Sequence, residues 1–163
     1  MRNIYIKLKI LRIMKDITSK LIGLFKSGYC TPQIARISKK LRVLSTTLHY
    51  NIKKLESEGK IKAYKAVFDY SKIDLGFCTY ALISLDPGEY ADPEKISHQL
   101  AKYDEVEGVD IVTGDWEIII KIRSKDQNDY FAFVKHALSI PGIAKSKSLV
   151  SFNQVKTEFV TLK

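Results

Sequence analysis

Apolar residues in the first 60 positions recur at the spacing of amphipathic helices. This spacing predicts helices over 16–28, 31–41 and 45–58, and a very short connection over 42–44 joins the last two. Thr31 is the expected N-cap of the second helix, with Pro32 in its first turn, where a missing N–H costs nothing. The inner faces are Ile17, Leu21, Leu24 and Phe25, then Ile34, Ile37, Ser38 and Leu41, then Leu44, Leu48, Ile52 and Leu55.

A supporting helix followed by two closely joined helices is the order of a helix-turn-helix. In that motif the second helix of the pair enters the major groove of DNA, with its N-terminal residues at the base edges. Small hydroxyl residues at the start of the third helix suit base edges, and the lysines farther along suit phosphates. A surface helix with a solvated polar face remains the alternative. The predicted DNA-contacting residues are Thr31, Gln33, Arg42, Ser45, Thr46, Thr47, His49, Tyr50, Lys53 and Lys54.

After Gly59, which is expected to end the third helix, the apolar period changes to that of strands. Segment 60–69 is predicted to be a strand, and 70–76 a hinge. The order that follows is strand, helix, strand, strand, helix, strand, which is the ferredoxin-like split unit. Its expected strands are 77–86, 106–113, 116–124 and 143–152. Its expected helices are 92–103 and 125–140, the second stopping before Pro141. A two-residue turn is expected at Gly114 and Asp115, and a further strand over 155–162.

The predicted fold class is α+β, with an N-terminal helix-turn-helix domain, winged-helix-like, and a C-terminal ferredoxin-like βαββαβ domain. The expected divisions are an N-terminal extension over 1–13, the helix-turn-helix over 14–60, a hinge strand and linker over 61–76, and the ferredoxin-like domain over 77–163. In the extension, apolar and basic residues alternate, which is typical of a strand or an extended basic arm. A native chain start at Met14 is the alternative.

The net charge of +9 is divided unevenly along the chain. Residues 1–65 contain sixteen Lys and Arg against three Asp and Glu, a net of +13, whereas residues 66–163 have a net of −4. A positive segment suits a phosphate backbone, because neutralising phosphates releases condensed counterions. A solvated lysine-rich surface explains a modest excess, but not a sharp step at one point in the chain.

The sequence contains little that supports an enzymatic function. His49, His98 and His136 are scattered, and Cys30 and Cys78 have neither metal-ligand spacing nor a histidine partner suggested by the sequence. We therefore expect no catalytic residue, no metal and no cofactor. Two cysteines without a disulfide framework, and no apolar run of membrane length, favour a cytoplasmic, nucleoid-associated protein without a membrane partner.

Two motifs carry a resemblance to a known family: "IKKLESEGKI" over 52–61 and "VTGDWE" over 112–117. Together with the order of elements, they make residues 14–163 similar to the Lrp/AsnC (feast/famine) transcription regulators. The resemblance implies sequence-specific, roughly palindromic operators and dimers formed by pairing the C-terminal sheets, with further assembly into tetramers or octamers. It also implies an amino-acid or similar effector bound between dimers, at Thr113, Gly114, Asp115, Trp116, Leu149, Val150 and Ser151.

The chain departs from the family pattern around the predicted turn. Arg42 stands where the family usually has glycine, and Ser38 where it often has alanine. Leu44 stands at the usual serine cap of the third helix, so Ser45 is expected to cap instead.

The third helix itself also departs from the pattern. His49 and Asn51 stand where arginines are common in the family. Arginine is the usual bidentate reader of guanine, so this departure puts G·C-specific readout in question, but not DNA binding itself. Two alternative functions remain: an enzyme like the sirohaem decarboxylases, which resemble this two-domain layout, and an architectural DNA-binding protein without an effector.

Overall fold

The structure, a computed structural model, describes residues 18–28, 30–157 and 160–161. The chain divides into two compact units, the first ending at Val67 and the second beginning at Phe68. The first unit therefore contains the whole positively charged part of the chain. The predicted extension over 1–13 lies outside the described residues.

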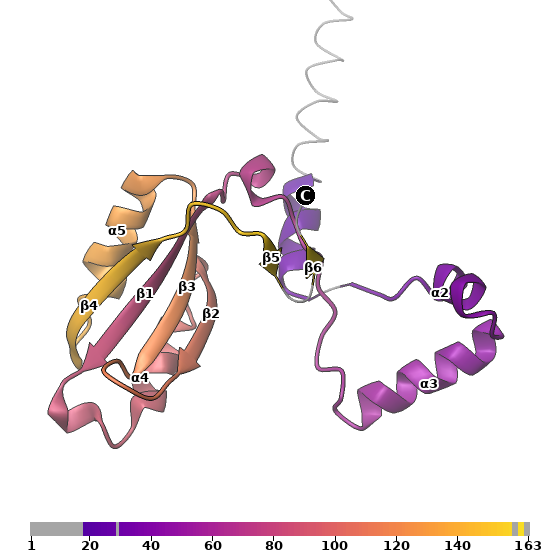
Figure 1. The fold of residues 1–163 in the computed structure, drawn as a ribbon, viewed down its shortest axis with the longest axis horizontal. Helices are drawn as coiled ribbons and strands as arrows, with labels where there is room; N and C mark the ends of the chain where they lie inside the picture. Colours follow the sequence, from indigo (N-terminus) through magenta and orange to yellow (C-terminus); the bar gives the residue numbers. More distant parts are fainter. Residues whose placement is uncertain (1–17, 29, 158–159, 162–163) are drawn as a thin grey trace, which may run out of the picture. The chain divides into compact units, whose positions relative to one another are not determined.

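Helices make up the regular structure described in the first unit. Residues 18–26 are helical, followed by α2 (Ile34–Leu41) and α3 (Ser45–Ser57) (Figure 1). Gly28, at φ 85°, follows the first helix as expected, because a positive φ suits glycine after a helix end. Leu48 is the buried apolar residue of α3, whereas Leu44 is 74% exposed. The predicted apolar stripe of the third helix is therefore only partly buried within the chain.

Three local predictions for this unit are wrong. The N-cap of α2 is Gln33 and not Thr31, since the helix begins two residues after Pro32, and the N-cap of α3 is Leu44 and not Ser45. Neither cap residue makes a side-chain capping hydrogen bond. Segment 60–69 has a single-residue bridge at Tyr64 and is otherwise irregular. Alternating apolar residues favour a strand, but a strand also needs a neighbour to pair with its N–H and C=O groups.

The second unit has the predicted βαββαβ order. Its elements are η1 (Tyr70–Ile73), β1 (Phe77–Leu85), η2 (Pro87–Glu89), α4 (Pro93–Leu100), β2 (Val106–Ile111), β3 (Ile118–Ser124), α5 (Gln127–Ala137) and β4 (Ile143–Val150). The four strands form one antiparallel sheet in the order β2-β3-β1-β4 (Figure 1). Two short strands follow, β5 (Lys156–Thr157) and β6 (Val160–Thr161), and they pair with each other in place of the one strand expected over 155–162.

Both helices of the second unit begin at an aspartate cap. The side chain of Asp92 accepts a hydrogen bond from the Lys95 N–H, and that of Asp126 accepts from Asn128 and Asp129. Asp92 is the predicted cap, and Pro93 follows in the first turn, where proline is tolerated.

The core lies between the two helices and one face of the sheet. Alternate residues of β1 and β3 face the helices, as the two-residue period of a strand requires. Burial of each large apolar side chain contributes roughly 1.5–3 kcal/mol. The core residues are Ala81, Ile83, Leu85, Ile118, Ile120 and Ile122 from the sheet, Ile96 and Leu100 from α4, and Tyr130, Phe133, Ala137 and Leu138 from α5.

A buried ion cluster lies on the other face of the sheet. The Arg123 Nε donates to Glu107 Oε2 at 2.7 Å, and the Lys121 Nζ donates to Glu107 Oε1 at 3.1 Å. The guanidinium of Arg123 stacks on the Tyr70 ring at 3.8 Å and also donates to Gln154. This cluster therefore fastens η1 and the segment after β4 to the sheet.

Candidate functional site

Two hydrogen bonds between Ser38 and Val43 close the connection between α2 and α3. The Ser38 hydroxyl donates to the Val43 carbonyl at 2.6 Å, and the Ser38 carbonyl accepts from the Val43 N–H at 3.3 Å. Arg42 lies between them in the left-handed region, at φ 55° and ψ 40°. Ser38 therefore adds a side-chain hydrogen bond to this turn, and Arg42 occupies a conformation that favours glycine.

Every residue predicted to contact DNA is exposed. Eight of the ten lie in the turn or on α3, and Thr31 and Gln33 precede α2 in the same unit. Thr46, Tyr50 and Lys53 occupy the face of α3 away from Leu48, as the helical period predicts. The exposed set is Thr31, Gln33, Arg42, Ser45, Thr46, Thr47, His49, Tyr50, Lys53 and Lys54.

Acidic partners that the sequence analysis missed lie beside the two lysines of α3. Lys53 Nζ lies 2.8 Å from Glu56 Oε2, and Lys54 Nζ lies 3.8 Å from Glu58 Oε1. Glu56 also accepts a hydrogen bond from the Tyr64 hydroxyl at 3.0 Å. The hydrogen bonds from Lys53 and Tyr64 lower the pKa of Glu56, so its negative charge stays beside Lys53. The spacing of the pairs, three and four residues apart on one helix, is the signal that reveals them.

The loop between β2 and β3 is longer than predicted. Val112 N–H donates to the Glu117 carbonyl at 2.9 Å, so the loop has four residues, 113–116, in place of the expected two. Gly114 has φ 116°, a conformation that residues with a side chain rarely adopt. Thr113, Gly114 and Asp115 are exposed, whereas Trp116 is half-buried.

Two residues that were not predicted as site residues hold this loop. The Glu117 side chain accepts a hydrogen bond from the Leu85 N–H at 2.9 Å, and the Glu117 N–H donates to the Ile83 carbonyl at 3.0 Å. Lys145 Nζ lies 5.1 Å from the centre of the Trp116 ring, within the range of a cation–π contact. The loop is therefore fixed to the end of β1 near Ile83.

The second group of predicted effector residues lies at the opposite end of the sheet. Leu149 pairs with Tyr80 and Val150 with Thr79, and the Ser151 N–H donates to the Cys78 carbonyl at 2.9 Å. Cys78 is five residues from Ile83 along β1, about 17 Å at the rise of a strand. One chain therefore does not bring Leu149, Val150 and Ser151 together with the 113–116 loop.

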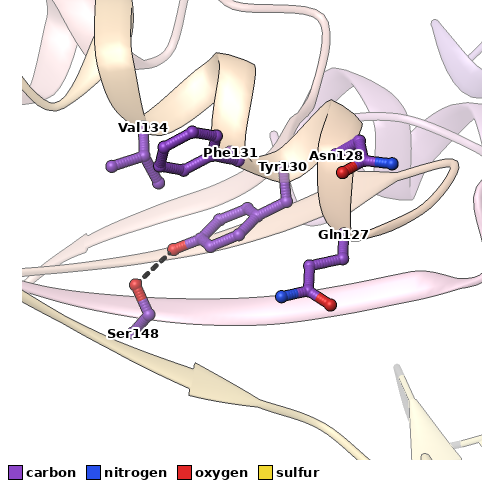
Figure 2. A pocket seen from close by; sticks show the side chains of 6 residues that line it. All are labelled: Gln127, Asn128, Tyr130, Phe131, Val134 and Ser148. Atoms are coloured by element: carbon purple, nitrogen blue, oxygen red, sulfur yellow. Dashed lines mark hydrogen bonds between the residues drawn. The ribbon is translucent and has the colours of Figure 1, made fainter.

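A hollow of about 450 Å³ lies between α5 and β4, lined by Gln127, Asn128, Tyr130, Phe131, Val134 and Ser148 (Figure 2). Its inner polar groups satisfy each other, since the Tyr130 hydroxyl and Ser148 Oγ are 2.5 Å apart. Burial raises the pKa of Tyr130, so its hydroxyl stays protonated. No histidine or carboxylate lines this hollow, so it lacks an acid–base pair for catalysis.

Across the described residues, no three His, Cys, Asp or Glu side chains are grouped to hold a metal ion. No helix in the same part of the chain is long and apolar enough to span a membrane.

The chain combines an α-helical unit of high positive charge with a βαββαβ unit that has a fixed hairpin loop. Residues 78–161 match the family model described as the Lrp/AsnC ligand binding domain. This match covers more than half of the chain, and the chain belongs to the Lrp/AsnC family.

Similar proteins agree with this assignment. An uncharacterized HTH-type transcriptional regulator of Pyrococcus furiosus is 36% identical over 126 residues, which cover 77% of this chain and 84% of the relative. The HTH-type transcriptional regulator FL11 of Pyrococcus horikoshii is 28% identical, with 84% of this chain and 88% of the relative covered. A transcriptional regulator from Neisseria meningitidis, solved in complex with L-Met, has the same fold: its TM-score is 0.68 at 22% identity, over 84% of this chain and 88% of that one.

Proposed function

We propose that this protein is a transcriptional regulator that binds double-stranded DNA in a sequence-specific manner, in the cytoplasm. The observation that carries the proposal is the exposed polar face of α3, in a unit whose charge is +13. α2 and α3 act as a helix-turn-helix, with α3 in the major groove. Ser45, Thr46 and Thr47 contact base edges, and Lys53 and Lys54 contact phosphates.

The regulator acts as a homodimer or a larger assembly of dimers. Two copies of α3 then meet successive major-groove faces, so the operator is roughly palindromic, with half-sites about one helical turn or a multiple apart. Apolar side chains left exposed in the first unit support an assembly, because another copy is able to cover them. The most exposed leucines of this unit are Leu44 at 74% and Leu41 at 58%.

A small effector, an amino acid or a similar molecule, binds between dimers and modulates the regulator. The family model that matches the second unit is that of a ligand-binding domain, and the structural neighbour from Neisseria meningitidis is an L-Met complex. The 113–116 loop and residues 149–151 are separated in one chain, so the effector site draws the two groups from different protomers. Asp115 holds the effector's ammonium, and backbone groups of the loop hold its carboxylate.

DNA binding is tested by selecting bound fragments from the host's own genomic DNA at physiological salt, with and without a pool of amino acids. Enrichment of a palindromic site, changed by the pool, is the expected result. Uniform recovery of all fragments would favour the architectural alternative, because a polycation holds any phosphate backbone.

The effector site is tested with Asp115→Asn. We expect the amino-acid pool to lose its effect on DNA binding, while assembly in analytical ultracentrifugation is unchanged without effector. Asp104→Asn, an exposed residue outside the site, is the matched control. A full response in Asp115→Asn would remove this residue from the effector site.

A further inference from the structure

Tyr64 joins the end of α3 to another part of the first unit. Its hydroxyl donates to Glu56 Oε1 at 3.0 Å, eight residues back along the chain. Its carbonyl oxygen lies close to Gly28, because a Cβ on that glycine would come within 3.3 Å of it. Tyr64 therefore contacts both the glycine that follows the first helix and the last turn of α3.

The Glu56 carboxylate has two donors, one on each oxygen. Lys53 Nζ lies 2.8 Å from Oε2, and the Tyr64 hydroxyl occupies Oε1. Partial desolvation, and then the hydrogen bond to Glu56, raise the pKa of Tyr64, so its hydroxyl stays protonated and remains a donor. The Lys53 side chain is 64% exposed, against 28% for Glu56. The ammonium group is therefore more open to a phosphate than its acidic partner is.

The neighbouring ion pair on α3 has a different arrangement. Lys54 Nζ lies 3.8 Å from Glu58 Oε1, and Lys60 Nζ lies 2.6 Å from Glu58 Oε2. Two lysines thus share Glu58, whereas Glu56 combines one lysine with a neutral donor. The hydrogen bond from Tyr64 therefore acts on the Lys53 pair and not on the Lys54 pair.

We propose that Tyr64 is a positioning residue for the phosphate contact of Lys53. A carboxylate that already accepts a hydrogen bond from a hydroxyl attracts an ammonium group less strongly, because the first donor stabilises part of its charge. When Lys53 leaves Glu56 for a phosphate, the Tyr64 hydroxyl still stabilises the carboxylate. Tyr64 thereby makes the release of Lys53 to DNA less costly. This inference rests on the proposed function, in which Lys53 contacts a phosphate.

The test is a double-mutant cycle in DNA binding by the full chain. Fluorescence anisotropy is measured on a duplex of arbitrary sequence, since phosphate contacts do not depend on sequence. Tyr64→Phe removes the hydroxyl and keeps the ring, and we expect its affinity to fall about three- to tenfold, because Glu56 then holds Lys53 more firmly. In the Glu56→Gln background, Tyr64→Phe is expected to have no effect, since no carboxylate remains to hold the lysine.

A measurement without DNA separates this role from a purely structural one. Hydrogen bonds from Lys53 and Tyr64 lower the pKa of Glu56, so Tyr64→Phe is expected to raise that pKa toward its ordinary value. A pH titration of the ¹³C-labelled protein, followed by NMR at the carboxyl carbon of Glu56, measures the change. Tyr90→Phe, which removes an exposed hydroxyl from the second unit, is the matched control for both experiments.

Three results would overturn the inference while DNA binding stands. They are equal affinity of the wild type and Tyr64→Phe, the same loss of affinity in the Glu56→Gln background, and an unchanged pKa of Glu56 in Tyr64→Phe. If the wild type bound no duplex, the proposed function and the inference would fail together.

Discussion

At the residue scale, Arg42 has an unfavourable backbone conformation and an exposed positive charge at the same position. Its left-handed backbone favours glycine, whereas its charge is available to DNA because the side chain is exposed. A residue kept in an unfavourable conformation in a turn next to the proposed recognition helix is consistent with a role in binding. If so, replacing Arg42 changes the stability of the α2–α3 pair and the affinity for DNA in opposite directions.

Arg42→Gly is expected to stabilise the α2–α3 pair by about 1 kcal/mol, because glycine has no Cβ to strain at φ 55°. The same change weakens binding to all DNA sequences, because a cation is lost. Hydrogen exchange of the α2 and α3 amides measures the change in stability. DNA titrations at a series of salt concentrations measure the change in affinity. Arg42→Lys keeps both the charge and the strain. Equal behaviour of the two variants would contradict the interpretation.

Glu56 reduces the positive field at the part of α3 that is proposed to face phosphates. Glu56→Gln removes the charge that lies 2.8 Å from Lys53 Nζ. We expect tighter DNA binding and a log–log salt slope steeper by up to about 0.9. Asp104→Asn, in the second unit, changes the net charge equally and is expected to leave the slope unchanged. If both variants respond alike, net charge and not the Lys53 pair determines the effect.

At the element scale, the loop between β2 and β3 depends on one glycine. Gly114→Ala is expected to destabilise the second unit by about 1–3 kcal/mol, because φ 116° is strained for alanine although no atom lies within 4 Å of the added Cβ. Gly108 also has open space and has no positive φ, so Gly108→Ala is the matched control. Urea unfolding followed by fluorescence of the single tryptophan, Trp116, measures both. Equal losses of stability in Gly114→Ala and Gly108→Ala would mean that strain in the loop is not the cause.

The ion cluster around Glu107 gives the second unit a pH dependence. Burial alone would raise the pKa of Glu107, but the hydrogen bonds and charges of Arg123 and Lys121 outweigh it and lower this pKa. A lowered folded-state pKa stabilises the fold above the unfolded value of about 4.3. That contribution is lost as the pH falls from there through the folded pKa.

Glu107→Gln is expected to lower the free energy of unfolding by about 3 kcal/mol at pH 7, because Arg123 loses its buried partner. Unfolding of the variant depends less on pH below about 4.3. Glu105→Gln, two residues away, is the control. The measurement is urea unfolding at a series of pH values. An unchanged pH profile in Glu107→Gln would contradict the role of the cluster.

Elements with strong local signals were predictable from the sequence. The strands β1 to β4 and the helices α4 and α5 follow apolar periods, and Asp92 marks a helix start. Features set by distant contacts were not predictable. The cluster joins Tyr70, Glu107, Arg123 and Gln154, which only the sheet register brings together. For the same reason, the separation of the 113–116 loop from residues 149–151 is known only from the pairing of β1 with β4.

At the scale of the whole molecule, charge divides the chain where the fold divides it. The unit ending at Val67 has a net charge of +13, and the remainder has −4. We therefore propose DNA binding for the first unit and effector binding for the second. The central claim is that the first unit recognises sequence and does not merely hold phosphates.

The most direct test is a fluorescence-anisotropy titration of the selected genomic site and of a scrambled duplex, across a series of salt concentrations, with the wild type and Thr46→Ala. The account predicts at least about a thousandfold preference of the wild type for the selected site. In Thr46→Ala this preference falls by a factor of about 5 to 150, while the salt slope is unchanged, because a base contact and not a phosphate contact is lost. Equal affinity of the wild type for both duplexes at every salt concentration would contradict the claim.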